Sequence, residues 1–322
     1  MKFTTPLYEL FQDEQRNRIF IKRDDLLPDS LGGNKVRIAE AFFRDMEERD
    51  CDALIGYGDI RSNLCRVLAS RCYQKKIPCY IICTGGDGEG HGETANSWIM
   101  KLSGAKLVPC RKTEIRETVE KLMSRLEGQG FRPYYIYGNS LGRGNEGVAA
   151  GAYVPVYREI LEQGRALGAA FDFLFLPSGT GATQSGLGCG HLLEGDPARI
   201  VGISISREKE RGTGIILEGV KEYFAGQGRK LPANAGEEVI LEDGYRRGGY
   251  GCCDKEILEC IRRVYLRTGV PMDPTYTGKA FLGMCSYIRD HKIQGKNLLF
   301  LHTGGTPLFY DAVSSGIFTA EE

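Results

Sequence analysis

Short apolar runs alternate along the chain with longer stretches in which apolar residues recur every three or four positions. The short runs have the length of buried strands, and the longer stretches have the period of amphipathic helices. Such alternation is typical of parallel sheets with helices on both faces. The pattern predicts strands at 19–22, 53–56, 79–83, 106–108, 134–137, 173–176, 201–205 and 298–302. It predicts helices at 35–49, 63–75, 94–102, 114–126, 146–163, 183–193, 213–224, 255–267 and 278–290.

The order of these elements divides the chain into two parts. Residues 45–148 hold a run of strand–helix units that suffices for a small α/β domain. Residues 1–44 and 149–322 would form a larger α/β domain into which the small one is inserted. Open parallel sheets bind ligands at the carboxyl ends of their strands, so the segments that directly follow strands are the candidates for a site.

The bulk composition argues against several classes of protein. Lys plus Arg and Asp plus Glu both number 42, so the charge gives no reason to expect nucleic acid or an acidic membrane as a partner. No apolar run approaches the roughly 18 residues of a membrane span, and the first residues lack a signal peptide's apolar segment. The 11 cysteines include no Cys-x-x-Cys pair, and the 4 histidines lack ligand spacing. We therefore expect a cytoplasmic protein with reduced cysteines and no metal.

Lys35 follows two glycines and an asparagine at the expected start of a helix. Glycines allow a ligand to approach the backbone closely. The positive end of a helix disfavours the charge of a nearby ammonium group, which lowers its pKa and favours the neutral amine. A neutral amine is the form that reacts with an aldehyde to make a Schiff base. The alternative is a surface lysine that follows a turn.

A stretch of small and hydroxyl residues follows the strand expected at 173–176. A strand that leads through a small-residue turn into a helix presents backbone N–H groups at the helix N-terminus, which suits a phosphate group. The stretch matches neither a Walker A loop nor a dinucleotide-binding fingerprint. A tight structural turn is the alternative. The residues concerned are Ser178, Gly179, Thr180, Gly181, Ala182 and Thr183.

Three further segments carry hydroxyl groups. Ser62 and Asn63 precede a helix, where they either cap it or offer N–H groups and a hydroxyl to a substrate carboxylate. Tyr250 and Tyr276 lie in loops, where a tyrosine is usually a packing residue. Thr303 follows the last strand and precedes two glycines, which suits another site for a small group.

These motifs run in the order Gly-Gly-Asn-Lys, Ser-Asn, Ser-Gly-Thr-Gly-Ala-Thr, Tyr-Thr-Gly-Lys-Ala and His-Thr-Gly-Gly. In that order they resemble the pyridoxal-phosphate enzymes of the tryptophan-synthase β-subunit fold, fold type II. The opening Ile-Lys-Arg-Asp-Asp-Leu resembles the branch that holds D-cysteine desulfhydrase and 1-aminocyclopropane-1-carboxylate deaminase. The resemblance implies two open parallel-sheet α/β domains with pyridoxal 5'-phosphate in the cleft between them. It also implies a homodimer.

The resemblance assigns contacts to the cofactor. Lys35 would hold it as a Schiff base and afterwards act as acid and base. Asn63 would hydrogen-bond its phenolic oxygen, and Thr277 and Thr303 would lie near its pyridine nitrogen. The phosphate would be held by the backbone and hydroxyls of the small-residue turn, namely Ser178, Gly179, Thr180, Gly181, Ala182 and Thr183.

The resemblance also assigns contacts to the substrate. Ser62 would meet its carboxylate or a reacting carbon, and Tyr250 and Tyr276 would flank it as acid–base or orienting groups. The family has Gln-Ser-Asn-His or Gln-Ser-Asn-Gln where the outer residues of this chain are Arg61 and Leu64. A guanidinium pairs well with a carboxylate or sulfonate. The substrate would then carry a second acid group or a larger side chain than D-cysteine.

Thr277 separates two reactions within this resemblance. Cyclopropane deaminases have a glutamate there, which keeps the ring nitrogen protonated and makes the ring a strong electron sink. A hydroxyl cannot hold a cation at that nitrogen, and elimination of a good leaving group needs less stabilisation than cyclopropane opening. We therefore expect a lyase that removes the α-proton, expels a β-substituent such as thiol, and releases pyruvate and ammonia. D-cysteine is the first candidate substrate, with L-cysteate and β-chloroalanine as relatives.

Other activities of the same fold stay open from the sequence. They are cyclopropane deaminase, β-replacement synthase, racemase, and amino-acid binding without catalysis. Each would use a small amino acid as its ligand, and β-replacement would need a second, nucleophilic substrate.

Overall fold

The computed structural model describes residues 3–84 and 93–318 and separates into two compact units. The larger unit comprises Met1–Asn34 and Ala149–Glu322, and the smaller one comprises Lys35–Val148. Each unit holds one sheet built mainly of parallel strands, with helices between the strands. The α/β fold class with two parallel-sheet domains is thereby confirmed.

The larger unit contains a six-stranded sheet in the order β1-β2-β10-β7-β8-β9. The strands are β1 (Leu7–Gln12), β2 (Arg18–Arg23), β7 (Phe173–Ser178), β8 (Arg199–Ser204), β9 (Ile240–Glu242) and β10 (Asn297–His302). All neighbours are parallel except β1, which forms an antiparallel hairpin with β2. Neither β1 nor β9 is predicted by the apolar pattern, because β1 is mostly half-buried at the sheet edge and β9 has only 3 residues.

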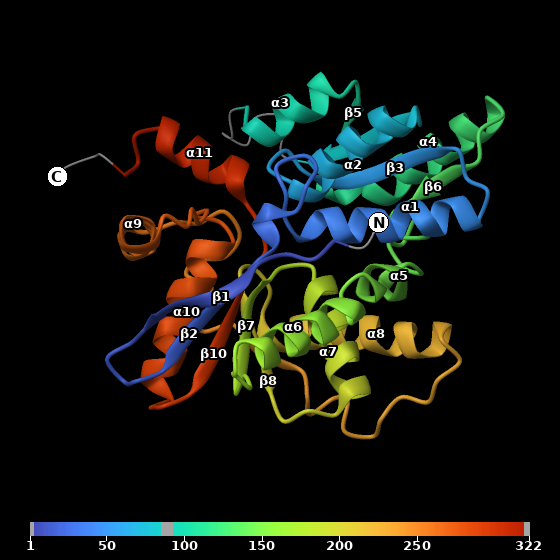
Figure 1. The fold of residues 1–322 in the computed structure, drawn as a ribbon. Coiled ribbons are helices and arrows are strands. Elements are labelled where there is room, and N and C mark those ends of the chain that lie inside the picture. The colour runs from blue at the N-terminus through green and yellow to red at the C-terminus, as the bar shows by residue number, and fades with distance from the viewer. Residues whose placement is uncertain (1–2, 85–92, 319–322) are drawn as a thin grey trace. The chain divides into compact units, whose positions relative to one another are not determined.

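Helices cover both faces of this sheet (Figure 1). On one face lie α9 (Lys255–Thr268) and α10 (Thr277–Asp290), where Ile21 and Phe300 of the sheet share a core with Phe281. On the other lie α6 (Val154–Ala166), α7 (Ala182–Glu194) and α8 (Lys209–Gly226). Alternate residues of each strand therefore face opposite layers, as a sheet buried on both sides requires.

Three helical segments differ from the sequence prediction. The helix expected at 146–163 is two helices, α5 (Glu146–Gly151) and α6, because a new helix begins after Tyr153 with Pro155 in its first turn. Proline suits a first turn, since it lacks the N–H that helix interiors need. A short helix after β10, α11 (Thr306–Ser314), is absent from the sequence prediction, as is the 3-10 turn η1 (Asp24–Leu26).

The smaller unit contains a four-stranded parallel sheet in the order β5-β4-β3-β6. The strands are β3 (Ala53–Asp59), β4 (Cys79–Thr84), β5 (Lys106–Pro109) and β6 (Pro133–Tyr135). The helices are α1 (Asn34–Glu48), α2 (Asn63–Lys75), α3 (Ala95–Leu102) and α4 (Ile115–Gly128), with the 3-10 turn η2 (Lys112–Glu114). Four of them agree with the predicted helices to within two residues at each end.

The start of the smaller unit lies at residue 35, not at residue 45 as the sequence division has it. Helix α1 is continuous across residue 44, so a boundary there would divide one helix between the two units. Its side chains bond within the smaller unit: Tyr134 donates to Asp45 at 2.6 Å, and Arg71 pairs with Glu40.

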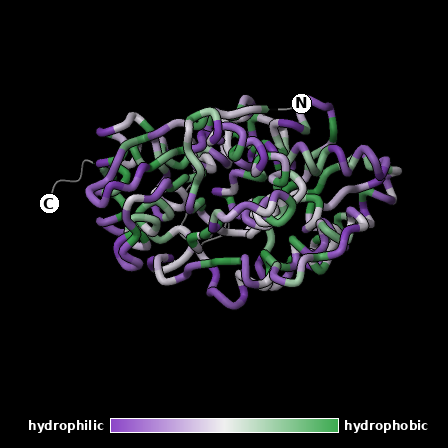
Figure 2. Tube along the Cα trace, turned by 60° about the horizontal axis from the view of Figure 1, so that its bottom comes forward, coloured by the Kyte–Doolittle hydropathy of each residue, from purple (hydrophilic) through white to green (hydrophobic). Residues whose placement is uncertain are grey.

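Hydrophilic and hydrophobic segments alternate along the coloured part of the trace (Figure 2). Among the residues that the structure describes, no helix combines the length and apolarity of a membrane span.

Candidate active site

The carboxyl ends of three adjacent parallel strands carry several candidate residues of the larger unit. Strand β10 lies between β2 and β7 and is parallel to both. The turn that leads to Asn34 follows β2, Thr303 follows β10 directly, and Ser178 ends β7. Neighbouring parallel strands end at the same edge, so these three turns meet there.

The turns after β2 and β10 touch through their backbones. The Asn34 N–H donates to the carbonyl oxygen of Thr303 at 2.9 Å. A Cβ placed on Gly304 would lie 2.6 Å from the Cα of Gly33, which is closer than side-chain carbons approach. Both glycines have positive φ, 100° and 109°. Glycine is therefore required at positions 33 and 304 by this close backbone approach.

Asn34 also reaches the turn after β7. Its Nδ2 donates to the Thr183 hydroxyl at 2.9 Å, in the first turn of α7. The residue directly before Lys35 is thus hydrogen-bonded to both neighbouring turns of the larger unit. Sequence reasoning assigned no role to Asn34, although an asparagine between Gly-Gly and the lysine was the available signal.

Lys35 lies in the first turn of α1, as the sequence predicts. Burial lowers the pKa of Lys35 from 10.5 to about 8. The direction agrees with that expected from a helix N-terminus, but desolvation is the cause in the structure. A sizeable fraction of the side chain is therefore a neutral amine near pH 8.

The turn after β7 presents an open helix end. Its N-cap, Gly181, has φ of 92°, and among the described residues no side chain caps the helix. The first N–H groups of an α-helix lack intrahelical acceptors, so those of Ala182 and Thr183 remain available as donors. Arg207 donates to the carbonyl of Gly179 and fixes the turn. Backbone donors at the positive end of a helix, beside the Ser178 hydroxyl, suit a phosphate dianion.

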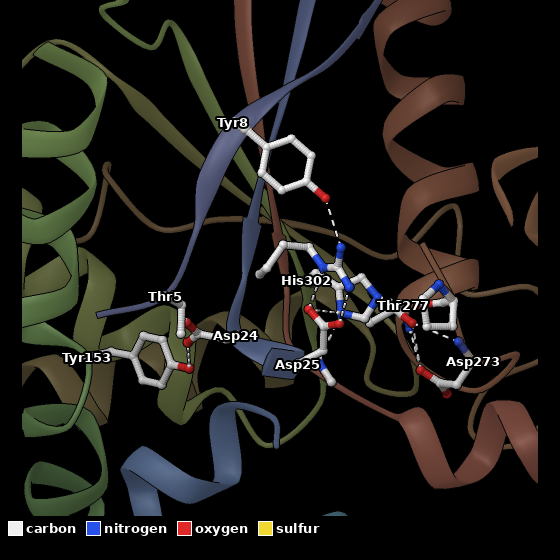
Figure 3. Close-up of polar contacts among 11 residues, drawn as sticks. Thr5, Tyr8, Asp24, Asp25, Tyr153, Asp273, Thr277 and His302 are labelled. Atoms are coloured by element: carbon white, nitrogen blue, oxygen red, sulfur yellow. Dashed lines mark hydrogen bonds and ion pairs between the residues drawn. The ribbon is translucent and has the colours of Figure 1, made fainter. Parts of the chain in front are cut away.

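Thr277 is the first residue of α10 and follows a loop that Asp273 organises (Figure 3). The Asp273 carboxylate accepts hydrogen bonds from the N–H groups of Thr275, Tyr276 and Thr277 at 2.8–3.0 Å. The Thr277 hydroxyl donates to the same carboxylate at 2.8 Å and accepts from the Asp273 N–H at 2.9 Å. Burial raises the pKa of Asp273, although these bonds oppose the shift. The Thr277 hydroxyl therefore uses a donor and an acceptor bond inside its own loop, and its place beside a ring nitrogen stays a prediction.

A buried polar network underlies these turns (Figure 3). His302, at the end of β10, lies with Nε2 2.6 Å from the Pro271 carbonyl oxygen and Nδ1 3.3 Å from Asp25. Asp25 forms an ion pair with Arg23, which also donates to the Tyr8 hydroxyl at 2.8 Å. Burial alone would lower the pKa of Arg23. The hydrogen bond and the charge of Asp25 outweigh this effect and raise that pKa above its ordinary value. This network joins the segments that bear the site.

The neighbouring Asp24 is buried as well. It accepts hydrogen bonds from the hydroxyls of Thr5, at 2.7 Å, and Tyr153. Its backbone carbonyl accepts the Gly33 N–H at 2.9 Å. The acidic pair after β2 therefore shapes the turn that leads to Lys35.

Tyr250 and Tyr276 come together from two loops of the larger unit. Their hydroxyl oxygens are 2.8 Å apart, and their rings meet edge to face with centroids 5.9 Å apart. Each lies in a loop, as expected, but the contact between them is not evident from a separation of 26 residues.

In the smaller unit, Ser62 and Asn63 lie together at the carboxyl end of β3. Ser62 caps α2, because its hydroxyl accepts the Cys65 N–H at 3.2 Å. The Asn63 Oδ1 accepts from Asn96 Nδ2 at 3.0 Å, which orients the amide so that its Nδ2 lies on the other side of the group. Gly58 is required here, since a Cβ would lie 2.9 Å from the Ser62 hydroxyl oxygen.

Arg61 and Leu64 flank this pair. The Arg61 Nε donates to Asp59 at 3.0 Å, so part of its charge is neutralised within the turn. Leu64 is buried at 8% exposure. Asn96 and Asp59 carried no signal in the sequence beyond their polarity, and neither was predicted.

Solved structures resemble this fold over its whole length. An ACC deaminase homologue is 27% identical, covers 98% of this chain and 94% of its own, and has a TM-score of 0.86. An O-ureido-L-serine synthase is 14% identical, with coverage of 99% and 93% and a TM-score of 0.67. A hydrogen sulfide-producing enzyme from Fusobacterium nucleatum is 17% identical, with coverage of 93% and 94% and a TM-score of 0.65.

A family model described as pyridoxal-phosphate dependent enzyme matches residues 2–304, which include every candidate residue above. The open end of α7 and the low pKa of Lys35 suit two groups of that cofactor, a phosphate that is bound and an aldehyde that reacts with an amine. The chain belongs to the family of pyridoxal-phosphate dependent enzymes.

Proposed function

We propose that the protein is a lyase that catalyses α,β-elimination from a small amino acid. D-cysteine is the first candidate substrate, and the products would be pyruvate, ammonia and the expelled thiol as hydrogen sulfide. The observation that carries the proposal is the set of bonds from Asn34 to Thr183 and Thr303. They connect the residue before the candidate Schiff-base lysine to the candidate phosphate turn. The likeness to an ACC deaminase homologue supports the same branch.

Lys35 is proposed to hold the cofactor and then to move the substrate's α-proton. The cofactor, when bound, supplies an electron sink conjugated to the substrate's α-carbon. A pKa near 8 suits the lysine to both tasks, because amine and ammonium forms then coexist near neutral pH. The backbone N–H groups at the start of α7, with Ser178, Thr180 and Thr183, would hold the phosphate.

Asn63 and Ser62 are proposed to contact the cofactor's phenolic oxygen and the substrate carboxylate, respectively. The bond from Asn96 supports the first role, since it leaves the Asn63 amide N–H₂ as the outward donor. The Ser62 hydroxyl accepts from the Cys65 N–H, and a serine hydroxyl can also donate one hydrogen bond, which a ligand oxygen could accept. Tyr250 and Tyr276 would flank the substrate, with one hydroxyl orienting the other.

The Asp273 loop supports elimination over cyclopropane opening. Thr277 follows Tyr276 where the deaminase pattern has a glutamate. The carboxylate in this loop is Asp273, and it already accepts four hydrogen bonds from the loop itself. A ring nitrogen would meet no uncommitted anion from these described residues. Expulsion of a good leaving group tolerates the weaker electron sink.

Arg61 bears on the choice between D-cysteine and a diacid such as L-cysteate. A second acid group on the substrate would compete with Asp59 for the guanidinium. We therefore rank D-cysteine before L-cysteate. In Arg61→Ala, activity on D-cysteine is expected to change less than activity on L-cysteate, and equal changes would assign Arg61 to the turn alone.

A visible spectrum and a pyruvate assay test the function. The purified protein should show a Schiff-base absorption band, and pyruvate should form from D-cysteine, L-cysteate or β-chloroalanine. Lys35→Ala should lose the band and the activity, whereas Lys75→Ala, at an exposed lysine paired with Glu47, should keep both. A band without pyruvate from any of these substrates would contradict the elimination.

Product analysis separates the alternatives. A cyclopropane deaminase would convert 1-aminocyclopropane-1-carboxylate to 2-oxobutyrate. A β-replacement synthase would need an added thiol and give a thioether, and a racemase would invert the amino acid without releasing ammonia. A binder would change its spectrum without any product. The homodimer and the cytoplasmic location stay predictions, the first of which sedimentation can test.

A further inference from the structure

Lys279 is a buried cation in the first turn of α10. Its side chain has 0% exposure, and its ammonium group donates to the backbone carbonyl oxygen of Gly249. Burial lowers the pKa of Lys279. Removing an ammonium group from water costs free energy that its bonds must offset. A lysine on the buried side of a helix, where an apolar residue would pack without this cost, therefore calls for a role.

The loop that Lys279 reaches has few side chains with which to pack. Arg247, Gly248, Gly249 and Gly251 all have positive φ, between 45° and 97°. The ends of the loop are held elsewhere. Tyr245 donates to Asp290 at 3.0 Å on one side, and Asp254 caps α9 on the other. The bond from Lys279 meets the middle of the loop, at the residue directly before Tyr250.

Tyr250 is thus held from the start of α10 at two points. Lys279 bonds the carbonyl that precedes it, and Tyr276, the N-cap residue of the same helix, lies 2.8 Å from its hydroxyl. The first fixes the backbone of Tyr250 and the second fixes the tip of its side chain. Because both come from one helix end, the geometry of the tyrosine pair depends on both.

We infer that Lys279 is a positioning residue that sets the hydroxyl of Tyr250 against that of Tyr276. This inference rests on the proposed function, in which Tyr250 and Tyr276 orient the substrate. It assigns Lys279 no contact with substrate or cofactor. Its effect on turnover must therefore pass through Tyr250.

A double-mutant cycle tests this dependence. Lys279→Met removes the donor and keeps the length of the chain, and Tyr250→Phe removes the hydroxyl. Lys279→Met should lower kcat/KM by about tenfold to a hundredfold, as loss of one charge-assisted hydrogen bond at a site permits. In the Tyr250→Phe background the same change should have less than about a threefold effect. Additive losses would overturn the inference, because a lysine that serves only general stability does not need Tyr250.

Two further variants make the cycle specific. Lys279→Gln keeps a donor without the charge, so it should recover part of the lost activity, and it replaces Lys279→Met in the cycle if the latter does not fold. Tyr245→Phe removes a bond from the end of the same loop, to Asp290, and should leave kcat/KM within about twofold. A loss in Tyr245→Phe as large as that in Lys279→Met would show general sensitivity of the loop and overturn the role of Lys279.

Hydrogen exchange gives a readout that needs no turnover. In cofactor-free Lys279→Met, the amides of 246–253 should exchange faster than in the wild type, whereas those of α7 should not change. Unchanged exchange at 246–253 would overturn the inference. If the wild type turns over none of the substrates, the proposed function fails by itself, and the exchange result still decides whether Lys279 holds the loop.

Discussion

Two strand–turn–helix segments of the protein share their order of elements but differ in how the first N–H groups of the helix are satisfied. Strand β7 leads through a turn into α7, and β3 leads through a turn into α2. At α2 the Ser62 hydroxyl accepts the Cys65 N–H, so the chain satisfies its own helix end. At α7 the N-cap is Gly181, and no side chain among the described residues takes that place. The helix dipole is the same in kind, but only α7 leaves its donors to a ligand.

This difference divides the binding task. An uncapped helix end suits a dianion, which meets several N–H groups at once. A capped end instead presents the capping side chain and its neighbour, here Ser62 and Asn63, to smaller groups. The difference is consistent with the proposed roles, in which the glycine turn would hold the cofactor's phosphate and the serine turn would meet the substrate carboxylate and the cofactor's phenolic oxygen.

Gly181→Asp is expected to have the largest effect, because it would give α7 a side-chain cap like that of α2. The new carboxylate would cap α7 and repel a phosphate, and the positive φ of 92° strains any side chain. Affinity for pyridoxal 5'-phosphate should fall by about a hundredfold, or roughly 2.7 kcal/mol. Titration of the cofactor-free protein, followed by absorbance, measures it.

Gly195→Asp is the matched control for that variant. Gly195 ends the same helix with φ of 66°, and a Cβ there would meet no atom within 4 Å. It carries similar backbone strain at the opposite end of α7. Cofactor affinity should stay within about twofold of the wild type. If both variants weaken binding equally, strain rather than the open helix end explains the loss.

The pKa of Lys35 gives a prediction on stability and pH. Burial lowers that pKa to about 8 in the folded protein, from 10.5. Between these two pKa values the unfolded chain binds more protons than the folded protein. The contribution of Lys35 to the free energy of unfolding therefore rises as the pH rises from about 8 to 10.5, and it is lost as the pH falls through the same range. The free energy of unfolding of the cofactor-free wild type, relative to Lys35→Met, should increase by on the order of 1 to 3 kcal/mol from pH 7.5 to pH 10. Urea unfolding at both pH values measures it, and a constant difference would contradict a buried, lowered pKa.

Ser62→Ala tests whether the serine that caps α2 also contributes to turnover. Loss of the cap should cost about 1 kcal/mol of stability, and loss of the hydroxyl should lower kcat/KM about tenfold. Thr94→Ala removes the capping box of α3 in the same unit, together with the bond from its hydroxyl to the Ile60 carbonyl, and should cost similar stability with a smaller loss of kcat/KM. Thermal unfolding and steady-state assays separate the two effects. Equal kinetic losses in both variants would reduce Ser62 to a structural cap.

Much of the fold was predictable because buried parallel strands are continuous apolar runs. The eight predicted strands are all present, whereas β1 and β9 were not predicted. Strand β1 forms its antiparallel pairs through the backbone while many of its side chains stay partly exposed, so no apolar run marks it. The break before α6 could have been predicted from Pro155, because a proline is accepted in the first turn of a helix but not in the interior of a longer one.

The site was predictable where its chemistry lies in local motifs. The glycine turn and the lysine after Gly-Gly-Asn are such motifs. Asn34 and Lys279 act through partners far along the chain, which no local pattern encodes. Asp273 was within reach, since Asp-Pro-Thr before a helix is a turn and capping signal. Lys279 was also detectable in principle, as a charge among the apolar residues of α10.

The place of β10 in the large sheet has a consequence for synthesis of the chain. Strand β10 is the last strand, yet it lies between β2 and β7 and pairs with both. Until residues 297–302 leave the ribosome, the sheet is two separate pieces with open edges, whereas the four strands of the smaller unit are complete by residue 135. Such late, long-range pairing folds slowly and exposes strand edges meanwhile. We expect nascent chains to acquire the smaller sheet first, and chains that stop before residue 297 to be prone to aggregation.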